Sequence, residues 1–284
     1  MQKGRVYRST GSWYDVKLNS GDFIKARIGG KFRTLSIKTT NPIAVGDEVE
    51  VSVNSQNEAV IKTISTRENY IIRKSVNLSK EAHIIASNID LAVLLVTISN
   101  PVTSAGFIDR FTVTAEAYNV PLLIVFNKMD IYDAAAMLQL EEYEKAYKIA
   151  GYKTLRTSVK EDIGISEFMD LIKGKTVLVS GNSGAGKSTL INKLIPNLEL
   201  KTSEISNSHQ TGKHTTTFAE MFDMNNTTKI IDTPGIKGFG LVDFEKDELS
   251  RYFPEMLNLL EDCKFHNCRH INEPGCKVRI DLEK

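Results

Sequence analysis

The stretch that decides the fold is "TVLVSGNSGAGKSTLINKL", residues 176–194, which reads as an apolar strand, a glycine-rich turn and the beginning of a helix. The turn matches the phosphate-loop pattern G-x-x-x-x-G-K-[ST], whose backbone N–H groups surround a phosphate while the lysine neutralises it and the hydroxyl binds Mg²⁺. Both flanks fit this pattern, so we predict a nucleotide site rather than a plain turn. The predicted contacts are Gly181, Asn182, Ser183, Gly184, Ala185, Gly186, Lys187, Ser188 and Thr189, with Ser188 on magnesium and Lys187 also acting in catalysis.

A second motif, "DTPG" at residues 232–235, follows the apolar strand "TKIID". In nucleotide hydrolases an aspartate at this place holds Mg²⁺ and the glycine N–H senses the γ-phosphate. Alone, the tetrapeptide is a turn that ends a strand. Its place after a phosphate loop favours magnesium binding by Asp232 and phosphate sensing by Gly235.

A third motif, "NKMD" at residues 127–130, ends the apolar strand "PLLIVF". The Asp130 carboxylate accepts hydrogen bonds from the N1–H and 2-amino groups of guanine, while Lys128 packs over the base. Adenine lacks both donors and would leave the carboxylate desolvated and unpaired, which is how binding sites reject an analogue. Alone, NKMD is a surface loop; with the other two motifs it predicts GTP and GDP as ligands, contacted by Asn127, Lys128, Met129 and Asp130.

Composition bounds the class of protein. The chain has 284 residues, 41% of them hydrophobic and 25% charged, which suits a multidomain globular protein. No segment approaches the ~20 apolar residues of a membrane span, and the first residues lack an apolar signal region, so we expect a cytoplasmic protein without membrane contact. The formal net charge is +1, but residues 1–38 carry nine Lys and Arg against Asp15 and Asp22, or 9 − 2 = +7. This excess predicts a polyanionic partner.

The first 64 residues read as about five short strands between Gly, Asn and Ser clusters, with alternation clear at Val49, Val51 and Val53. This pattern favours a small OB-like β-barrel; an SH3-like barrel and a small sandwich are the alternatives. Trp13 and Tyr14 are either core residues or platforms for base stacking. Residues 65–80 show no clear period and are predicted to be a linker.

From Asn88 onward, near-continuous apolar runs alternate with helical patterns around 107–118, 134–150 and 165–172, with a further strand at "TLRTSV". This alternation predicts a doubly wound α/β sheet with ligands at the carboxyl ends of its strands. A helical stretch is expected at 244–260. We therefore predict three domains: the barrel at 1–66, the nucleotide-binding domain at 67–243, and a C-terminal module at 244–284.

The last 22 residues hold all three cysteines, in the pattern Cys263-x₄-Cys268-x-His270-x₅-Cys276. Three thiolates and one imidazole make a closed tetrahedral ligand set, which is typical of one structural Zn²⁺ stapling a small module. An odd number of cysteines in a cytoplasmic chain argues against a disulfide framework. His266 is an alternative fourth ligand.

The order of the motifs, base-reading before phosphate loop before DTPG, resembles that of the circularly permuted GTPases. With a barrel before this domain and a Cys/His cluster after it, essentially the whole chain resembles the small-ribosomal-subunit-dependent GTPases (RsgA/YjeQ type). The resemblance implies a monomeric GTP hydrolase that binds the small ribosomal subunit and its rRNA during late subunit maturation, with turnover stimulated by the subunit. It also selects His270 as the fourth zinc ligand.

The same resemblance implies further positions. Ser158 in "RTSVKEDIG" corresponds to the remaining guanine-contacting element, although Val159 replaces its usual small residue. The family usually continues into a longer terminal helix than the "KVRIDLEK" that follows Cys276. Because DTPG leads directly into the C-terminal module, we expect γ-phosphate sensing to move that module relative to the barrel.

The switch segment is expected at 208–222, "SHQTGKHTTTFAEMF", with Thr216 completing the magnesium shell. The threonine run is alternatively the start of an exposed strand. Ile236 stands where many GTPases place a water-orienting glutamine, so His214 is the candidate catalytic residue by resemblance, or else a contact to rRNA. The alternative functions are a GTPase acting on another RNA or RNP, as in RNA modification, and a nucleotide-gated RNA-binding module with negligible turnover.

Overall fold

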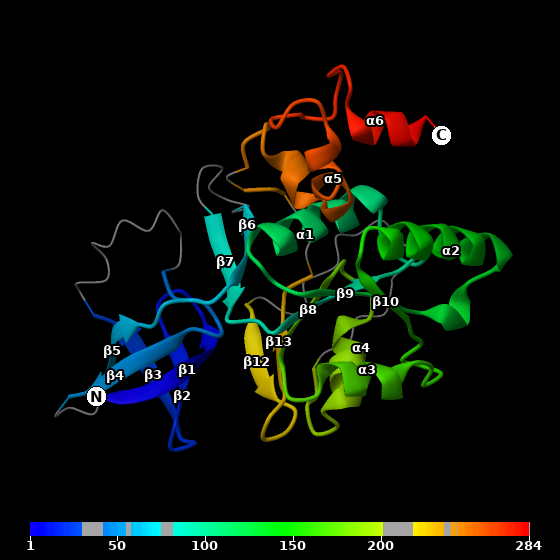
Figure 1. Ribbon diagram of the computed structural model, residues 1–284. Helices are drawn as coiled ribbons and strands as arrows, with labels where there is room; N and C mark the ends of the chain where they lie inside the picture. Colours follow the sequence, from blue (N-terminus) through cyan, green and yellow to red (C-terminus); the bar gives the residue numbers. More distant parts are fainter. Residues whose placement is uncertain are drawn as a thin grey trace.

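The computed structural model describes residues 1–29, 42–54, 58–74, 82–200, 218–235, 240–242 and 244–283. The chain forms a β-barrel, a central α/β sheet with helices on both faces, and a C-terminal group of short helices (Figure 1). In these ranges no helix is both long and apolar enough to cross a membrane. The predicted switch residues His214 and Thr216, and Ile236, which follows DTPG, lie outside the described residues.

The barrel consists of five strands whose side chains alternate between its interior and its surface. They pair in the order β1-β2-β3-β5-β4, and β4 pairs back with β1, which closes the barrel. The closed five-stranded barrel agrees with the predicted N-terminal architecture. Tyr14 is fully buried in its core, whereas Trp13 is 42% exposed, so only Trp13 is placed to stack on a base. The strands are β1 (Gln2–Ser9), β2 (Tyr14–Leu18), β3 (Phe23–Ile28), β4 (Glu48–Val53) and β5 (Ala59–Ile64).

The linker predicted at 65–80 was wrong in part, because β6 (Tyr70–Lys74) lies within it. This strand pairs with β7 (Ala82–Ser87) in a separate two-stranded sheet. Ile71 packs into the core of the central sheet, whereas its neighbour Ile72 packs against Ala44 of the barrel side. A strand that is buried on both faces lacks the polar alternation by which strands are recognised in a sequence.

The central sheet has the order β10-β9-β8-β11-β13-β12, and its first five strands are parallel. This arrangement confirms the predicted doubly wound α/β domain. The antiparallel edge strand β12 falls in a stretch that the sequence assigned to the switch. The strands are β8 (Leu91–Val96), β9 (Leu122–Phe126), β10 (Lys153–Arg156), β11 (Thr176–Gly181), β12 (Glu220–Asp223) and β13 (Lys229–Asp232).

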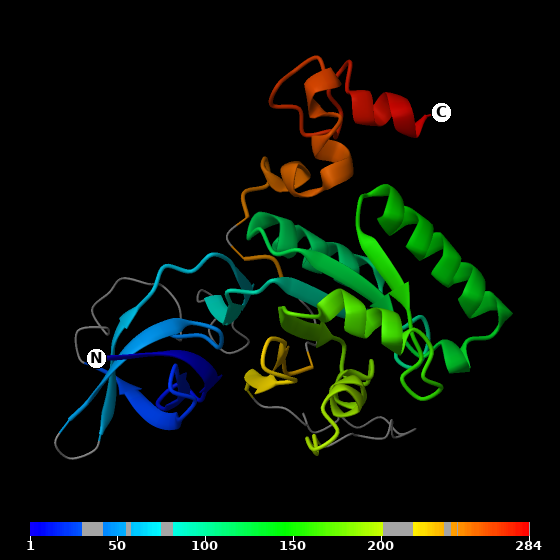
Figure 2. The ribbon, with the colours of Figure 1, turned by 60° about the horizontal axis from the view of Figure 1, so that its bottom comes forward.

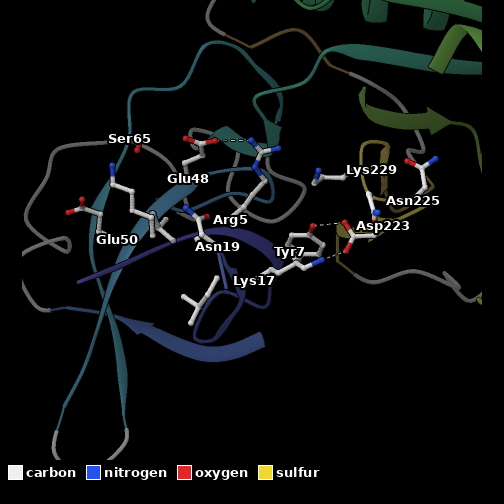
Figure 3. Close-up of a pocket in the computed structure, with 15 residues that line it drawn as sticks. Arg5, Tyr7, Lys17, Asn19, Glu48, Glu50, Ser65, Asp223, Asn225 and Lys229 are labelled. Atoms are coloured by element: carbon white, nitrogen blue, oxygen red, sulfur yellow. Dashed lines mark hydrogen bonds and ion pairs between the residues drawn. The ribbon is translucent and has the colours of Figure 1, made fainter. Parts of the chain in front are cut away.

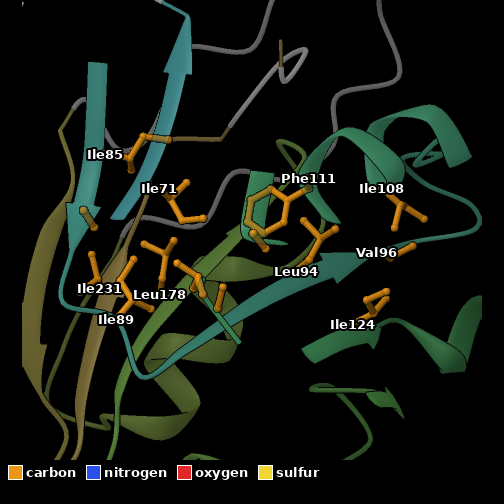
Figure 4. Close-up of a cluster of buried hydrophobic side chains, with 14 of the residues drawn as sticks. Ile71, Ile85, Ile89, Leu94, Val96, Ile108, Phe111, Ile124, Leu178 and Ile231 are labelled. Carbon is orange, nitrogen blue, oxygen red and sulfur yellow. The ribbon is translucent and has the colours of Figure 1, made fainter. Parts of the chain in front are cut away.

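Two helices cover each face of this sheet (Figures 1 and 2). On one face α1 (Ala105–Ala117) and α2 (Ala134–Ile149) pack on residues such as Leu94 and Ile124; on the other, α3 (Ile165–Ile172) and α4 (Lys187–Leu194) pack on residues such as Val93 and Val179. Ile71 and Ile85 of the β6–β7 hairpin enter the first of these cores beside Phe111 (Figure 4). The hairpin is therefore part of the sheet's core and not a tether.

The barrel contacts this body at several places, of which a strand pairing and a buried ion pair are two. Arg8 of β1 pairs with Glu220 of β12, which makes the barrel and the central sheet continuous. At the second place the fully buried Asp47 accepts hydrogen bonds from Arg67 Nε at 2.7 Å and Ser87 Oγ at 2.6 Å. These contacts cross the boundary predicted near residue 66; that boundary and the one near residue 243 stay predictions.

The C-terminal module lies over α1, which contacts η3 (Figure 1). The helical stretch expected at 244–260 is present as short helical segments and not as one continuous helix. Pro254 begins a new helix at its first position, where a missing N–H costs nothing, and it cannot continue the turn before it. The elements are η3 (Leu249–Tyr252), α5 (Pro254–Leu257), η4 (Leu260–Asp262) and α6 (Lys277–Leu282).

Candidate functional site

Four predicted motifs meet at one edge of the central sheet. The phosphate loop follows β11, DTPG follows β13, NKMD follows β9 and Ser158 follows β10. Because these strands are parallel, their carboxyl ends share an edge even though NKMD comes first in the chain. The fold therefore assembles one site from segments that are distant in sequence.

Two glycines of the phosphate loop occupy positions that exclude any side chain. Gly181 has φ 149° and Gly186 has φ 101°. A Cβ on Gly181 would lie 2.5 Å from the Leu95 carbonyl oxygen, and one on Gly186 would lie 2.5 Å from Asn127 Nδ2. The loop thus depends on glycine for its backbone conformation and for its close approach to the NKMD segment.

Lys187 is enclosed by the same loop. It is 8% exposed, and its Nζ donates to the carbonyl oxygens of Gly181 and Asn182, both at 2.8 Å. Burial lowers the pKa of Lys187 to about 8, against the opposing attraction of Asp232. A phosphate at this place would replace two neutral carbonyls with a full negative charge, which favours the protonated ammonium.

The DTPG segment lies against the phosphate loop. Asp232 is 1% exposed at the end of β13, and the Thr233 hydroxyl donates to the Val179 carbonyl at 2.9 Å. A Cβ on Gly235 would lie 3.1 Å from the Ser183 Cα, so the DTPG glycine lies close to the loop backbone.

The NKMD segment is braced on both sides. Asn127 Nδ2 donates to the Ala185 carbonyl at 2.9 Å, which ties the base-reading segment to the phosphate loop, and Thr157 Oγ1 donates to Asn127 Oδ1 at 3.0 Å. Lys128 has φ 70°, and its Nζ donates to the Asn100 carbonyl at 2.6 Å.

Asp130 is oriented by Ser158, whose hydroxyl donates to Asp130 Oδ1 at 2.6 Å. Between the braced segments lies a cavity of about 380 Å³, which is the size of a small-ligand pocket. Met129, by contrast, packs against the hydrophobic core and is not among the lining residues. The cavity is lined by Asn100, Asn127, Lys128, Asp130, Ile131, Val159, Lys160, Gly186 and Thr189.

Three supporting residues were missed by the sequence analysis. Tyr132 donates its hydroxyl to the Asn127 carbonyl at 2.5 Å and accepts from the Ile98 N–H at 2.9 Å, and Thr157 and Asn100 hold Asn127 and Lys128 as described. Only Thr157 carried a signal, as a hydroxyl at the end of an apolar strand beside Ser158. Asn100 and Tyr132 act across loops, which no sequence period reveals.

The C-terminal cluster brings together the four residues predicted to bind zinc. The ligand atoms of Cys263, Cys268, His270 and Cys276 all lie within 4.8 Å of one another, and His270 Nδ1 is 3.3 Å from Cys276 Sγ. Sulfur atoms at 2.3 Å from a tetrahedral Zn²⁺ are about 3.8 Å apart, so the spacing and the donor set fit this metal. His266 is exposed and is not part of the cluster.

The loop between the last two ligands is held by Glu273, which the sequence analysis did not single out. Hydrogen bonds from its own backbone N–H and from those of Arg269, Ile271 and Asn272 lower the pKa of Glu273 to about 2. His270 has φ 59°, in the left-handed region, and its ring faces the thiols. The Lys277 N–H donates to Cys263 Sγ at 3.3 Å, as expected around a metal-bound thiolate.

Comparisons with known proteins were made for the whole chain. The family profile "RsgA GTPase" matches residues 64–242, and the profile "RsgA N-terminal domain" matches residues 3–61. A curated relative, "Small ribosomal subunit biogenesis GTPase RsgA" of Christiangramia forsetii, is 53% identical and covers 99% of this chain and 90% of its own. "Small ribosomal subunit biogenesis GTPase RsgA 2" of Bacteroides thetaiotaomicron is 49% identical, covering 99% and 91%.

Two solved structures have the same fold along the whole chain. YjeQ from Thermotoga maritima superposes with a TM-score of 0.76 at 32% identity, covering 99% of this chain and 91% of that one. A second crystal structure, described as YloQ, a circularly permuted GTPase, superposes with a TM-score of 0.71 at 26% identity, covering 100% and 88%.

Proposed function

The chain belongs to the RsgA family of circularly permuted GTPases of small ribosomal subunit biogenesis, and from this we propose that it binds the small subunit with GTP, hydrolyses GTP to GDP and phosphate there, and then leaves. We place this cycle late in subunit maturation, in the cytoplasm, with the protein acting as a monomer. The observation that carries the proposal is the joining of the base-reading segment to the phosphate loop by the bond from Asn127 to Ala185.

The base pocket supports guanine as the ligand. Ser158 holds one oxygen of Asp130, so the carboxylate is oriented before a base arrives. Guanine offers two N–H groups to this carboxylate, whereas adenine would leave it without either bond inside the pocket. The aliphatic part of the Lys128 side chain and the apolar Val159 side chain then lie beside the base.

The phosphate loop supports binding of the phosphate groups of the nucleotide. Lys187 is positioned to exchange its two carbonyl partners for phosphate oxygens, and the N–H groups of 182–188 surround that place. Ser188 and Asp232 supply hard oxygen donors that suit Mg²⁺, and Thr216 is proposed as a third donor. When bound, the magnesium ion neutralises charge on the phosphates during transfer.

The attacking water must be oriented by a residue other than the one after DTPG, where many GTPases have a glutamine. Ile236 has no polar group with which to orient a water molecule. We propose that His214 does so when the protein is bound to the subunit. Catalysis of phosphoryl transfer depends on positioning and charge neutralisation, so a partner that orders a switch raises turnover strongly.

The C-terminal cluster is proposed to hold one structural Zn²⁺ through Cys263, Cys268, His270 and Cys276. All four positions of a tetrahedral ion are then taken by protein, so the metal contributes folding and no reaction step. The basic barrel and this module lie on two sides of the GTPase domain (Figure 1), and we propose that both contact rRNA.

The proposal is tested by GTP turnover of the chain alone and with purified small subunits, large subunits or bare tRNA. Stimulation by small subunits only is the expected result. Stimulation by tRNA instead would favour a GTPase of RNA modification, and RNA binding that depends on nucleotide without any stimulated turnover would favour a nucleotide-gated binding module.

A further inference from the structure

The outer surface of barrel strands β2 and β3 is basic and aromatic. Phe23, Lys25 and Arg27 alternate along β3 and are exposed, while Ala26 between them is buried in the barrel. Lys17 of β2 lies opposite Phe23 in the strand register. We call the surface formed by Trp13, Lys17, Phe23, Lys25 and Arg27 the outer face.

Each exposed aromatic ring of the outer face has a cation beside it. The Arg27 guanidinium lies 3.9 Å from the centre of the Trp13 ring, and Lys17 Nζ lies 5.7 Å from that of Phe23. Trp13 is 42% exposed and Phe23 is 58% exposed. Phe23 and Arg27 are four residues apart along β3, or about 13 Å, so the Phe23 ring and the Trp13 ring beside Arg27 serve different bases. Exposed rings interleaved with cations are the features that bind single-stranded nucleic acid.

The outer face ends in a groove against the GTPase domain. In the described residues β1 and β12 pair only at Arg8 and Glu220. Beside Phe23, between the barrel and β12, lies a cavity of about 440 Å³, large enough for one nucleotide base. The barrel residues Arg8, Asp15, Phe23 and Lys25 line one side of it, and Glu220, Phe222 and Asp223 of β12 line the other.

The carboxylates of β12 pair with Lys17 of the outer face and with Arg8 of the groove. Asp223 accepts from Lys17 Nζ at 2.5 Å and from the Tyr7 hydroxyl at 2.7 Å, as Figure 3 shows. Glu220 lies 3.9 Å from Arg8 Nε. A carboxylate held by Lys or Arg is an anionic hydrogen-bond acceptor, as an RNA phosphate would be in the same place.

We propose that the outer face and its groove bind an unpaired RNA segment, and that Asp223 and Glu220 occupy Lys17 and Arg8 in place of RNA phosphates until the RNA displaces them. This inference rests on the proposed function, which supplies RNA as the partner. Its consequence is mechanical, because β12 begins three residues after Thr217, at the end of the predicted switch. RNA that displaces Asp223 from Lys17 therefore removes a contact of β12, which directly follows the predicted switch.

Trp13 is the only tryptophan of the chain, so its fluorescence reports on the outer face alone. Oligouridylate of about ten nucleotides, within the site size of such barrels, is the probe. We expect it to quench Trp13 fluorescence in the full chain. The Asp223→Asn variant should bind the oligonucleotide about two- to fivefold more tightly, because it lacks the partly exposed ion pair with Lys17 that competes with the RNA. Phe23→Ala should bind about fivefold or more weakly, the effect of losing one stacked base.

The matched control is Glu58→Gln, which removes the same charge from the distant end of the β4–β5 hairpin, where Glu58 contacts Asn54 and, among the described residues, forms no ion pair. Equal tightening in Asp223→Asn and Glu58→Gln, or unchanged affinity in Asp223→Asn, overturns the inference. Phe23→Leu keeps the apolar bulk without the flat ring, so weak binding by this variant at an unchanged melting temperature assigns the loss to stacking.

The same wild-type preparation is assayed for small-subunit-stimulated GTP turnover. Stimulated turnover without quenching of Trp13, or with quenching but no effect of Asp223→Asn, overturns this inference and leaves the proposed function standing. Absence of both stimulation and oligouridylate binding contradicts the proposed function, and the inference falls with it.

Discussion

At the scale of single residues, Asp130 and Lys187 divide the recognition of the nucleotide between them. Asp130 is oriented by Ser158 toward the base cavity, and Lys187 is buried within the phosphate loop. Neither residue reaches both ends of the ligand. The link between them is Asn127, whose amide donates to Ala185 of the loop and accepts from Thr157.

Asp130→Asn should weaken GDP binding about 100-fold or more, because an amide cannot accept both guanine N–H bonds. The same variant should bind xanthine nucleotides better than the wild type, since xanthine has a carbonyl where guanine has its amino group. Displacement of a fluorescent GDP measures both affinities. Glu141→Gln, an exposed charge change on α2, is the control and should leave them unchanged.

The buried lysine predicts a pH dependence of nucleotide binding. Burial lowers the pKa of Lys187 to about 8 in the nucleotide-free protein, and a bound phosphate raises it. Affinity for GDP should therefore be constant below about pH 7.5 and fall as the pH rises through 8, where binding takes up a proton. Calorimetry in two buffers of different ionisation enthalpy measures this uptake at pH 8.5.

The Lys187→Arg variant is the control for this proton uptake. A guanidinium does not titrate in this pH range, so any proton uptake that remains in the variant comes from other groups, such as the guanine ring. Proton uptake that is the same in Lys187→Arg and in the wild type would contradict the assignment to Lys187.

At the scale of elements, the helices and strands with a clear hydrophobic period were the ones that the sequence predicted well. The helix at 165–172 has alternate faces of clearly different polarity and was predicted to the residue, and the strand–loop–helix around the phosphate loop was equally clear. The β6 strand was missed because Ile71 and Ile72 are buried on opposite faces. Strand β12 was missed because its place is set by long-range pairing with β13 and not by its own four residues. Long-range hydrogen bonds leave no local period to read.

The junction between the barrel and the β6–β7 hairpin predicts a large effect on stability. Arg67→Met would leave the buried Asp47 carboxylate with Ser87 but without its cation, at a cost of about 3 kcal/mol or more in the free energy of unfolding. Urea denaturation followed by circular dichroism measures this cost. The double variant Arg67→Met with Asp47→Leu removes both charges and should recover part of the loss; a double variant as unstable as the sum of the two single variants would contradict the argument.

The C-terminal cluster predicts a local and not a global effect of metal removal. Chelation, or Cys268→Ser, should remove about one zinc per chain by elemental analysis and increase amide hydrogen exchange in 244–283. GDP affinity should stay unchanged, because the base and phosphate contacts belong to the central sheet. Loss of GDP binding in step with loss of zinc would show that the module is not a separate folding unit.

At the scale of the whole molecule, the permuted order of the motifs places the three segments proposed to contact the phosphates and magnesium one after another in the chain. The phosphate loop, the predicted switch with β12, and DTPG follow one another along the chain and lead into the C-terminal module. The barrel precedes them but pairs with β12, whose Glu220 lies opposite Asp232 of DTPG, and the C-terminal module follows DTPG along the chain. The sequence predicted the three parts and their order, but the pairing of β1 with β12 involves residues over 200 positions apart and required the structure.

This arrangement leads to the central claim that GTP, and not GDP, sets the molecule in the form that holds the small ribosomal subunit. The most direct test is co-sedimentation of the chain with purified small subunits in the presence of GDP or of a GTP analogue that is not hydrolysed. We predict that the protein sediments with the subunits in the analogue and stays in the supernatant in GDP. Equal sedimentation with the two nucleotides would contradict the account.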